Sequence, residues 1–316
     1  MGQIAQTRAD QLWPQKSDRI VFLCHTKDGG SALRRCLESV EPLHPHASVI
    51  LVDDRTKDDS IKIAARFPRT HVRYFTWDHS FSSAKNRCLQ KAMDLSKLRY
   101  GDWVLFMGDD FELQPHTIPE ILEFVKDETN FFAQFWVPEY SPPPSSMARR
   151  ILNSFGLFRE KVVSRRRKLL WRHHPQIFWE KSVHEEAVYS AYRLTGQGLT
   201  FGGPDWKDFP VLGGRNGMIH YGYHEDGGEN GEYFLWKKNY YLVLGQIDSV
   251  RYKLNEPETE EGRRKALCKI LNREVSRIDT WSEIELLVAR YCAGDHPPGL
   301  AAFVERLKEF PNEYEL

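Results

Sequence analysis

The chain has 316 residues, of which 41% are hydrophobic and 28% are charged, proportions typical of a soluble globular protein with a substantial core. Its 44 Lys and Arg residues balance 44 Asp and Glu residues, so the overall charge gives no reason to expect nucleic acid as a partner. No apolar run reaches the length of a transmembrane helix, and residues 1–18 form a polar segment without the features of a signal peptide. We therefore expect a cytoplasmic protein whose five scattered cysteines are buried free thiols.

Short apolar segments alternate with segments of helical periodicity over the first half of the chain. Strands are predicted at residues 19–25, 47–52, 71–75, 103–107 and 130–137. Helices are predicted at residues 32–40, 61–67, 118–126 and from residue 81 onward. Most of these strands are apolar throughout instead of alternating, which indicates a sheet covered on both faces. The alternation of strand and helix predicts an α/β fold with a mostly parallel, doubly wound sheet flanked by helices.

The second half of the chain begins irregularly and ends with a helical pattern. Residues 195–217, rich in Gly, Pro and Asp, are predicted to form a long loop, and helices are expected at residues 233–244, 258–271, 280–292 and 300–309. The expected domains are residues 19–228, for the α/β part, and residues 229–316, a helical C-terminal region. That region is expected to cap the sheet, to bind an acceptor or to form a homo-oligomer.

Two of the predicted strands end in paired carboxylates. Asp53-Asp54 follows residues 47–52, and Asp109-Asp110 follows residues 103–107 after Gly108. Open α/β sheets bind ligands beyond the carboxyl ends of their strands. Adjacent carboxylates there are costly unless a cation or a hydrogen-bonding ligand compensates them. The pattern favours a divalent cation shared with substrate phosphates, and the alternative is a pair of solvated turns.

Six segments in order resemble the family 2 glycosyltransferases, which are nucleotide-sugar enzymes of the GT-A fold. They are RCLESV at 35–40, VILVDDRTKD at 49–58, FSSAKNR at 81–87, GDWVLFMGDD at 101–110, VHE at 183–185 and IHYGY at 219–223. The last two resemble elements of one bacterial branch. The resemblance covers about residues 19–240 and leaves the helical tail outside it.

The resemblance implies roles for individual residues. Nucleotide-binding residues are expected at Asp53, Asp54, Lys85, Asn86 and Asp109. Lys85 stands where the family has Arg, beside the donor diphosphate. A divalent cation, Mn or Mg, is expected on Asp110 with His220 completing its shell. Gly108 stands where the family's first metal-strand Asp is expected, so Asp109 would contact the nucleoside and Asp110 the metal. For Asp54, Lys85 and His220 the alternatives are a helix cap, a surface charge and a core histidine.

An inverting sugar transfer needs a carboxylate that takes the acceptor's proton. Glu185 is the candidate base, with Asp205 as the alternative. The sugar and acceptor cleft is expected to include His184, Trp179 and Tyr223, with Trp136 and Trp171 as further aromatic candidates.

The expected function is a hexosyltransferase that moves a sugar from a nucleotide diphosphate donor to an unidentified acceptor. One rival is a nucleotidyltransferase on a related sheet. The other is a non-catalytic nucleotide-binding scaffold that has lost the metal site, an alternative that Gly108 keeps open.

Overall fold

The structure is a computed structural model that describes residues 16–78, 80–139, 163–175, 177–180, 186–189, 210–221, 232–257, 259–272 and 279–294. Its contacts divide the chain into two compact units. The first contains residues 1–77, 83–179 and 186–228, and the second contains residues 78–82, 180–185 and 229–316. The two units are described separately.

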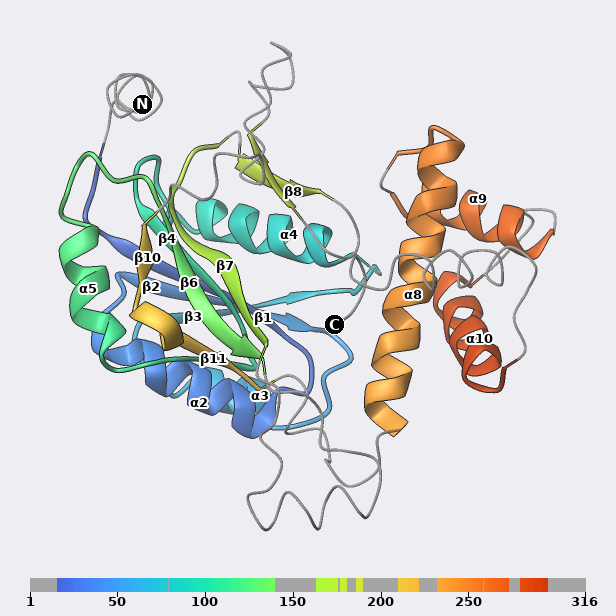
Figure 1. Cartoon of the computed structure of the whole chain (residues 1–316), viewed down its shortest axis with the longest axis horizontal. Helices are drawn as coiled ribbons and strands as arrows, with labels where there is room; N and C mark the ends of the chain where they lie inside the picture. The colour runs from blue at the N-terminus through green and yellow to red at the C-terminus, as the bar shows by residue number, and fades with distance from the viewer. Residues whose placement is uncertain are drawn as a thin grey trace. The chain divides into compact units, whose positions relative to one another are not determined.

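The first unit is built around one large sheet (Figure 1). Its strands are β1 (Ile20–Thr26), β2 (Ala47–Asp53), β3 (Thr70–Phe75), β4 (Trp103–Gly108), β5 (Phe111–Leu113), β6 (Phe132–Glu139), β7 (Val163–Arg172), β10 (Val211–Leu212) and β11 (Met218–His220). Its helices are α2 (Gly30–Val40), α3 (Ser60–Ala64), α4 (Phe81–Asp94) and α5 (Thr117–Phe124), with short 3-10 turns η1 (Glu41–Leu43) and η3 (Gly214–Asn216). Strands β8 (Ile177–Glu180) and β9 (Glu186–Tyr189) form a separate pair.

The strand order explains why the carboxyl ends meet. The main sheet runs β3-β2-β1-β4-β7-β6-β11-β5, with β10 also paired to β6. Strands β3, β2, β1 and β4 are mutually parallel, whereas β7 is antiparallel to both of its neighbours. The mostly parallel α/β sheet that the sequence predicted is confirmed. Since β1 lies between β2 and β4, the two predicted carboxylate pairs flank the tip of β1.

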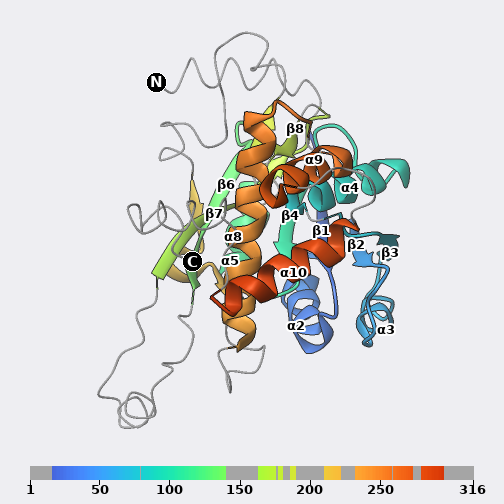
Figure 2. The same ribbon diagram turned by 90° about the vertical axis from the view of Figure 1, so that its right-hand side faces the viewer.

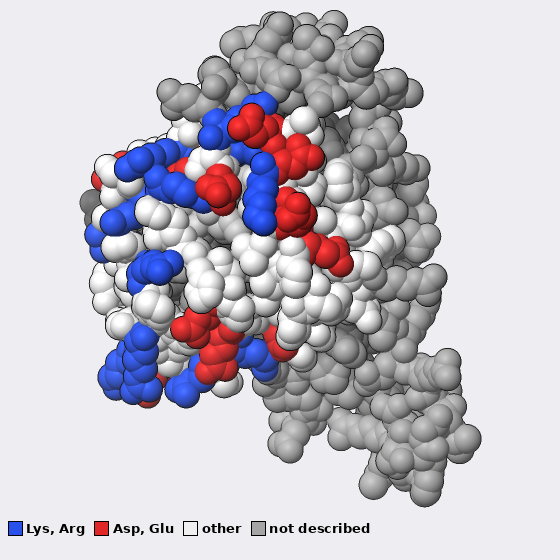
Figure 3. Space-filling view, turned by 90° about the vertical axis from the view of Figure 1, so that its left-hand side faces the viewer, with Lys and Arg blue, Asp and Glu red and all other residues white. Residues whose placement is uncertain are grey.

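Helices cover both faces of the sheet, which is why its central strands are apolar throughout. Alternate residues of β1 point to opposite faces: Phe22 packs in the core beneath α2, α3 and α5, and Leu23 packs in the core beneath α4 and β8. Figure 1 shows α2 and α4 on opposite sides of the strands. On the face shown in Figure 3, acidic and basic side chains of the described residues are interspersed, without a broad field of one sign.

A buried arginine stabilises the end of the sheet that lies opposite to the carboxyl ends of β1 and β4. Arg172, 1% exposed, donates to the carbonyl oxygens of Ser17 (2.8 Å), Asn130 (3.0 Å) and Gly101 (3.1 Å). Its guanidinium also lies 4.5 Å from the centroid of the Trp103 ring. The next residue, His173, is equally buried, and burial lowers its pKa to about 4. These contacts stabilise the sheet where no ligand is expected.

The second unit is helical. It contains α8 (Glu232–Lys253), α9 (Glu260–Leu271) and α10 (Thr280–Cys292), which lie together in Figures 1 and 2. Helix α9 begins at Thr259, whose hydroxyl accepts a hydrogen bond from the Gly262 amide at 3.2 Å, a typical N-cap. The three helices share a buried core that includes Leu244, Leu267 and Leu287. In the described residues no helix is long and apolar enough to cross a membrane.

Several elements differ from the sequence-based expectations. Strands β5, β7 and β11 were not predicted. The described part of the expected loop 195–217 contains β10 and η3, and the helix expected at residues 300–309 lies outside the described residues. Four of the cysteines are buried free thiols as expected, but Cys292 is exposed.

Candidate active site

The candidate site lies at the carboxyl ends of β1, β2 and β4. In the register of the sheet, His25 of β1 is level with Leu51 of β2 and with Gly108 of β4. Asp54 and Asp109 therefore follow the two strands on either side of β1. Cys24, the residue before His25, is fully buried. Contact with the Cys36 thiol, together with burial, raises the pKa of the Cys24 thiol, which therefore stays protonated.

The two carboxylates after β2 have different environments. Asp53 is 2% exposed and accepts hydrogen bonds from the Arg55 backbone amide (2.8 Å) and from Nε (3.1 Å) and Nη2 (3.0 Å) of the same residue. Asp54 has a side chain that is 42% exposed and accepts a hydrogen bond from the Thr76 hydroxyl at 2.5 Å. Asp54 therefore has the more exposed carboxylate of this pair, although Arg55 Nε also lies 4.0 Å from its Oδ1, while Asp53 is buried against Arg55.

The two carboxylates after β4 point in different directions. Asp109 accepts a hydrogen bond from the hydroxyl of Thr26 at the tip of β1. A Cβ atom at Gly29 would lie 2.6 Å from Oδ2 of Asp109, so the turn between β1 and α2 can approach this carboxylate only because residue 29 has no side chain. Asp109 therefore lies beside the turn that leaves β1.

Asp110 is paired with a residue far along the chain. Its Oδ2 lies 3.0 Å from Nε2 of His220. The imidazole stacks on Phe111, with ring centroids 4.5 Å apart and planes 26° apart, and the Tyr221 amide donates to the Asp110 carbonyl oxygen at 2.9 Å. Strands β5 and β11, which carry these residues, pair antiparallel with Phe111 opposite His220. The pairing brings Asp110 and His220 together.

Asp110 and His220 suit a divalent cation that takes its remaining ligands from elsewhere. Carboxylate oxygen and imidazole nitrogen both bind first-row divalent metals, and one or two protein carboxylates with substrate phosphates are a common arrangement for Mg²⁺. Their side chains are 26% and 12% exposed, so both reach solvent. Among the described residues no three His, Cys, Asp or Glu side chains cluster as a metal site. The two residues thus fit a cation that also binds substrate phosphates.

Lys85 and Asn86 lie on α4, the helix that packs against one face of the sheet. The Lys85 ammonium is 5.4 Å from the Phe106 ring centroid and 5.6 Å from that of Trp179. The Asn86 side chain donates to the Trp179 carbonyl oxygen at 2.9 Å and accepts from the Trp179 amide at 2.8 Å. Asn86 is thus occupied by the backbone of β8, a role that the sequence did not suggest, because residue 179 is 93 positions away.

The remaining predicted site residues divide into two groups. Trp179 is 6% exposed and packs in the core against Trp171 (ring centroids 4.9 Å apart) and Phe106 (5.5 Å apart). Trp136, on β6, is half-buried. The candidate base, its alternative and two cleft candidates lie outside the described residues: Glu185, Asp205, His184 and Tyr223.

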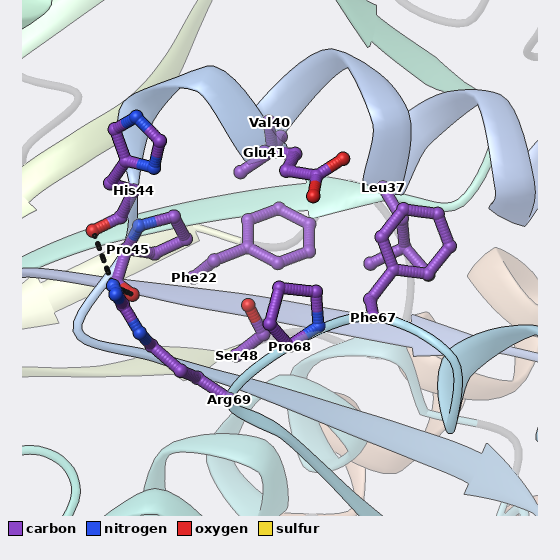
Figure 4. Close-up of a pocket in the computed structure, with 10 residues that line it drawn as sticks. All are labelled: Phe22, Leu37, Val40, Glu41, His44, Pro45, Ser48, Phe67, Pro68 and Arg69. Carbon is purple, nitrogen blue, oxygen red and sulfur yellow. Dashed lines mark hydrogen bonds between the residues drawn. The ribbon is translucent and has the colours of Figure 1, made fainter.

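A small cavity of about 70 Å³ lies away from these residues. Figure 4 shows it between the end of α2 and the segments that lead into β2 and β3, lined by Phe22, Phe67 and Pro68 among others. Arg69 borders it and donates to the carbonyl oxygen of His44 at 3.3 Å. None of its lining residues was predicted as a site residue.

Comparison with known proteins shows the family to which the chain belongs. A family model described as glycosyl transferase family 2 matches residues 20–187, just over half of the chain. The chain therefore belongs to glycosyl transferase family 2, and its sheet is of the GT-A type. That membership makes it a glycosyltransferase in general terms. No curated protein matches.

Solved structures give weaker likenesses. The chain is 14% identical to Staphylococcus aureus TarS, with a TM-score of 0.41, over 90% of this chain and 50% of that one, so it spans half the length of that protein. It is 12% identical to the 1–349 portion of TarS in complex with UDP-GlcNAc, with a TM-score of 0.42, over 92% of each chain. It is 10% identical to 4-diphosphocytidyl-2C-methyl-D-erythritol synthase, with a TM-score of 0.35, over 50% of this chain and 76% of that one.

Proposed function

We propose that this glycosyltransferase moves a hexose from a nucleotide diphosphate sugar to an acceptor nucleophile, with inversion at the anomeric carbon. The observation that carries the proposal is the meeting of Asp110 and His220, 3.0 Å apart, on the β4 side of the β1 tip. The open carboxylate of Asp54 lies on the β2 side of the same tip. A bound donor would have its nucleoside near Asp54 and its diphosphate near Asp110.

Five of the described residues have a role in this proposal. The Asp54 carboxylate accepts hydrogen bonds from the nucleoside, and Asp109, fixed by Thr26, lies beside the turn where the ribose would bind. Asp110 and His220 would hold a Mn²⁺ or Mg²⁺ ion, which supplies positive charge for the departing diphosphate. Lys85 stays in the proposal as a phosphate-binding residue, although in this structure its ammonium lies near aromatic rings.

The general base is proposed from the sequence resemblance. Glu185 is the candidate that would take the acceptor's proton, with Asp205 as the alternative, and neither lies within the described residues. The C-terminal helical region is proposed to serve the acceptor, to form an oligomer or to cap the sheet. A cytoplasmic location is part of the proposal.

The test is donor binding and hydrolysis with and without metal. UDP and GDP, each with and without Mn²⁺, are screened for a rise in melting temperature, because a ligand that binds only the folded protein stabilises it. UDP- and GDP-sugars are then screened for metal-dependent hydrolysis. We expect one nucleotide to stabilise the protein more with Mn²⁺, and we expect Asp110→Asn to abolish both the metal effect and the hydrolysis.

A matched variant controls for the loss of a carboxylate as such. Asp94 lies at the end of α4 with a side chain that is 50% exposed, so Asp94→Asn removes a surface carboxylate outside the candidate site. Nucleotide binding without any sugar transfer or hydrolysis would favour the scaffold. Release of pyrophosphate from a nucleoside triphosphate and a sugar phosphate would favour a nucleotidyltransferase.

A further inference from the structure

Helix α2 supports the segment that carries Asp110. The Arg35 Nε lies 3.5 Å from Oε2 of Glu112 on β5, and the Ser39 hydroxyl, one helical turn later, accepts a hydrogen bond from the Leu113 amide at 3.0 Å. The segment that follows Asp110 is thus held against the helix at two points.

Arg35 also contacts the residue that follows the strand carrying His220. Its guanidinium lies 4.1 Å from the ring centroid of Tyr221, the residue after His220. Glu112, the ion-pair partner of Arg35, is opposite Ile219 in the β5–β11 register. One side chain therefore contacts β5 and the residue directly after β11, next to the two proposed metal ligands.

We infer that Arg35 is a positioning residue for the Asp110–His220 pair, an inference that rests on the proposed function. Each of the two strands is only three residues long, so few backbone hydrogen bonds fix their separation. A planar guanidinium can stack on an aromatic ring and pair with a carboxylate at the same time, which a lysine ammonium does not do as well. Removing it leaves the Ser39–Leu113 hydrogen bond as the remaining one of these two contacts between α2 and β5, so the strand pair and the proposed metal ligands can shift more easily relative to α2.

Removal of such a supporting contact weakens metal binding, typically by 10- to 100-fold when the contact is made directly to a ligand. Arg35 acts one residue further away, so we expect about a 10-fold loss of Mn²⁺ affinity in Arg35→Met and a smaller loss in Arg35→Lys. Tyr221→Phe keeps the ring and is expected to bind Mn²⁺ like the wild type, whereas Tyr221→Leu is not. The matched control is Arg34→Met, which removes an exposed arginine from the same helix.

Two measurements on the full chain decide the question. The first is Mn²⁺ affinity in the presence of UDP, followed by electron paramagnetic resonance. The second needs no metal: it is hydrogen exchange at the Tyr221 amide, which donates to the Asp110 carbonyl oxygen at 2.9 Å. We expect about 10-fold faster exchange in Arg35→Met and unchanged exchange in Arg34→Met.

The outcomes separate this inference from the proposed function. If Arg35→Met binds Mn²⁺ and exchanges Tyr221 like the wild type, or if Arg34→Met shows the same losses, the positioning role is refuted. If the wild type binds no Mn²⁺ with UDP, the metal part of the proposed function fails. Hydrogen exchange at the Tyr221 amide then tests the positioning role without metal. Faster exchange in Arg35→Met supports that role, and unchanged exchange refutes it.

Discussion

The Asp110 carboxylate lies against Gly108, with Oδ1 2.7 Å from the point that a Cβ atom of residue 108 would occupy. The ring of Phe111 lies 3.1 Å from the same point. Any side chain at position 108 would therefore meet both the proposed metal ligand and the ring on which His220 stacks. The glycine that departs from the family's Asp-x-Asp pattern is part of the geometry that places Asp110 beside His220.

Gly108→Asp is expected to impair the enzyme although it restores the family pattern. The new side chain would displace the Asp110 carboxylate, and a misplacement of about 1 Å can cost about 100-fold in rate. The measurement is kcat/KM for metal-dependent donor hydrolysis. Gly108→Ala, which adds only the Cβ, should show a smaller loss. Wild-type or higher activity in Gly108→Asp would contradict this account of residue 108.

The two carboxylates after β2 are expected to give opposite phenotypes. Asp54→Asn should weaken nucleotide binding by about 10- to 150-fold with little change in stability, since the loss of one hydrogen bond to a charged group amounts to about 1.5–3 kcal/mol. Asp53→Asn should lower the free energy of unfolding instead, because Arg55 would lose its buried partner. Isothermal titration with the nucleotide and urea unfolding separate the two effects. Equal effects on binding would place Asp53 in the site.

Asn86→Ala is expected to lower the free energy of unfolding. The Asn86 side-chain amide donates one hydrogen bond to the Trp179 backbone and accepts another from it. Loss of this contact should cost about 1–3 kcal/mol in the free energy of unfolding. Gln90→Ala, at an exposed position of the same helix, is the control and should change little. Nucleotide affinity, measured well below the melting temperature of each variant, should stay within about twofold of the wild type. A selective loss of affinity at full stability would show that Asn86 contacts the donor.

The buried His173 predicts a loss of stability in mild acid. Burial lowers its pKa from 6.5 to about 4, so the folded protein holds the ring neutral while the unfolded chain becomes protonated below about pH 6.5. This contribution is fully present above that pH and is lost as the pH falls toward 4, a change of about 3 kcal/mol. Urea unfolding between pH 7 and pH 4 measures it.

His173→Gln should remove most of this dependence on pH. A smaller residual slope is expected from His46 and His71, whose pKa values burial also lowers. An unchanged slope in His173→Gln would show that the acid sensitivity arises elsewhere.

The nucleotide side of the site could be predicted from the sequence because each of its strands ends at a visible signal. Runs of apolar residues end at Asp53 and Gly108, and an open sheet places such ends along one edge. The roles of individual side chains were less visible, since adjacent residues such as Asp53 and Asp54 differ in burial and partners, not in residue type. The Asp110–His220 contact could be proposed only from the family resemblance, because strands of three residues give no detectable period.

The β5–β11 pairing also bears on how the protein reaches its active form. Its residues lie about 110 positions apart in the sequence, as Asp110 and His220 do, so the pairing closes a long loop late in synthesis. The emerging chain can assemble β1 to β4 well before residue 220 leaves the ribosome, since domains generally form as the N-terminal part appears. Strands β1 to β4 would then form before β11 pairs with β5, and a nascent chain would hold Asp110 without His220 until β11 arrives. Such long-range pairing is slow, so the Asp110–His220 contact should form after β1 to β4 have assembled.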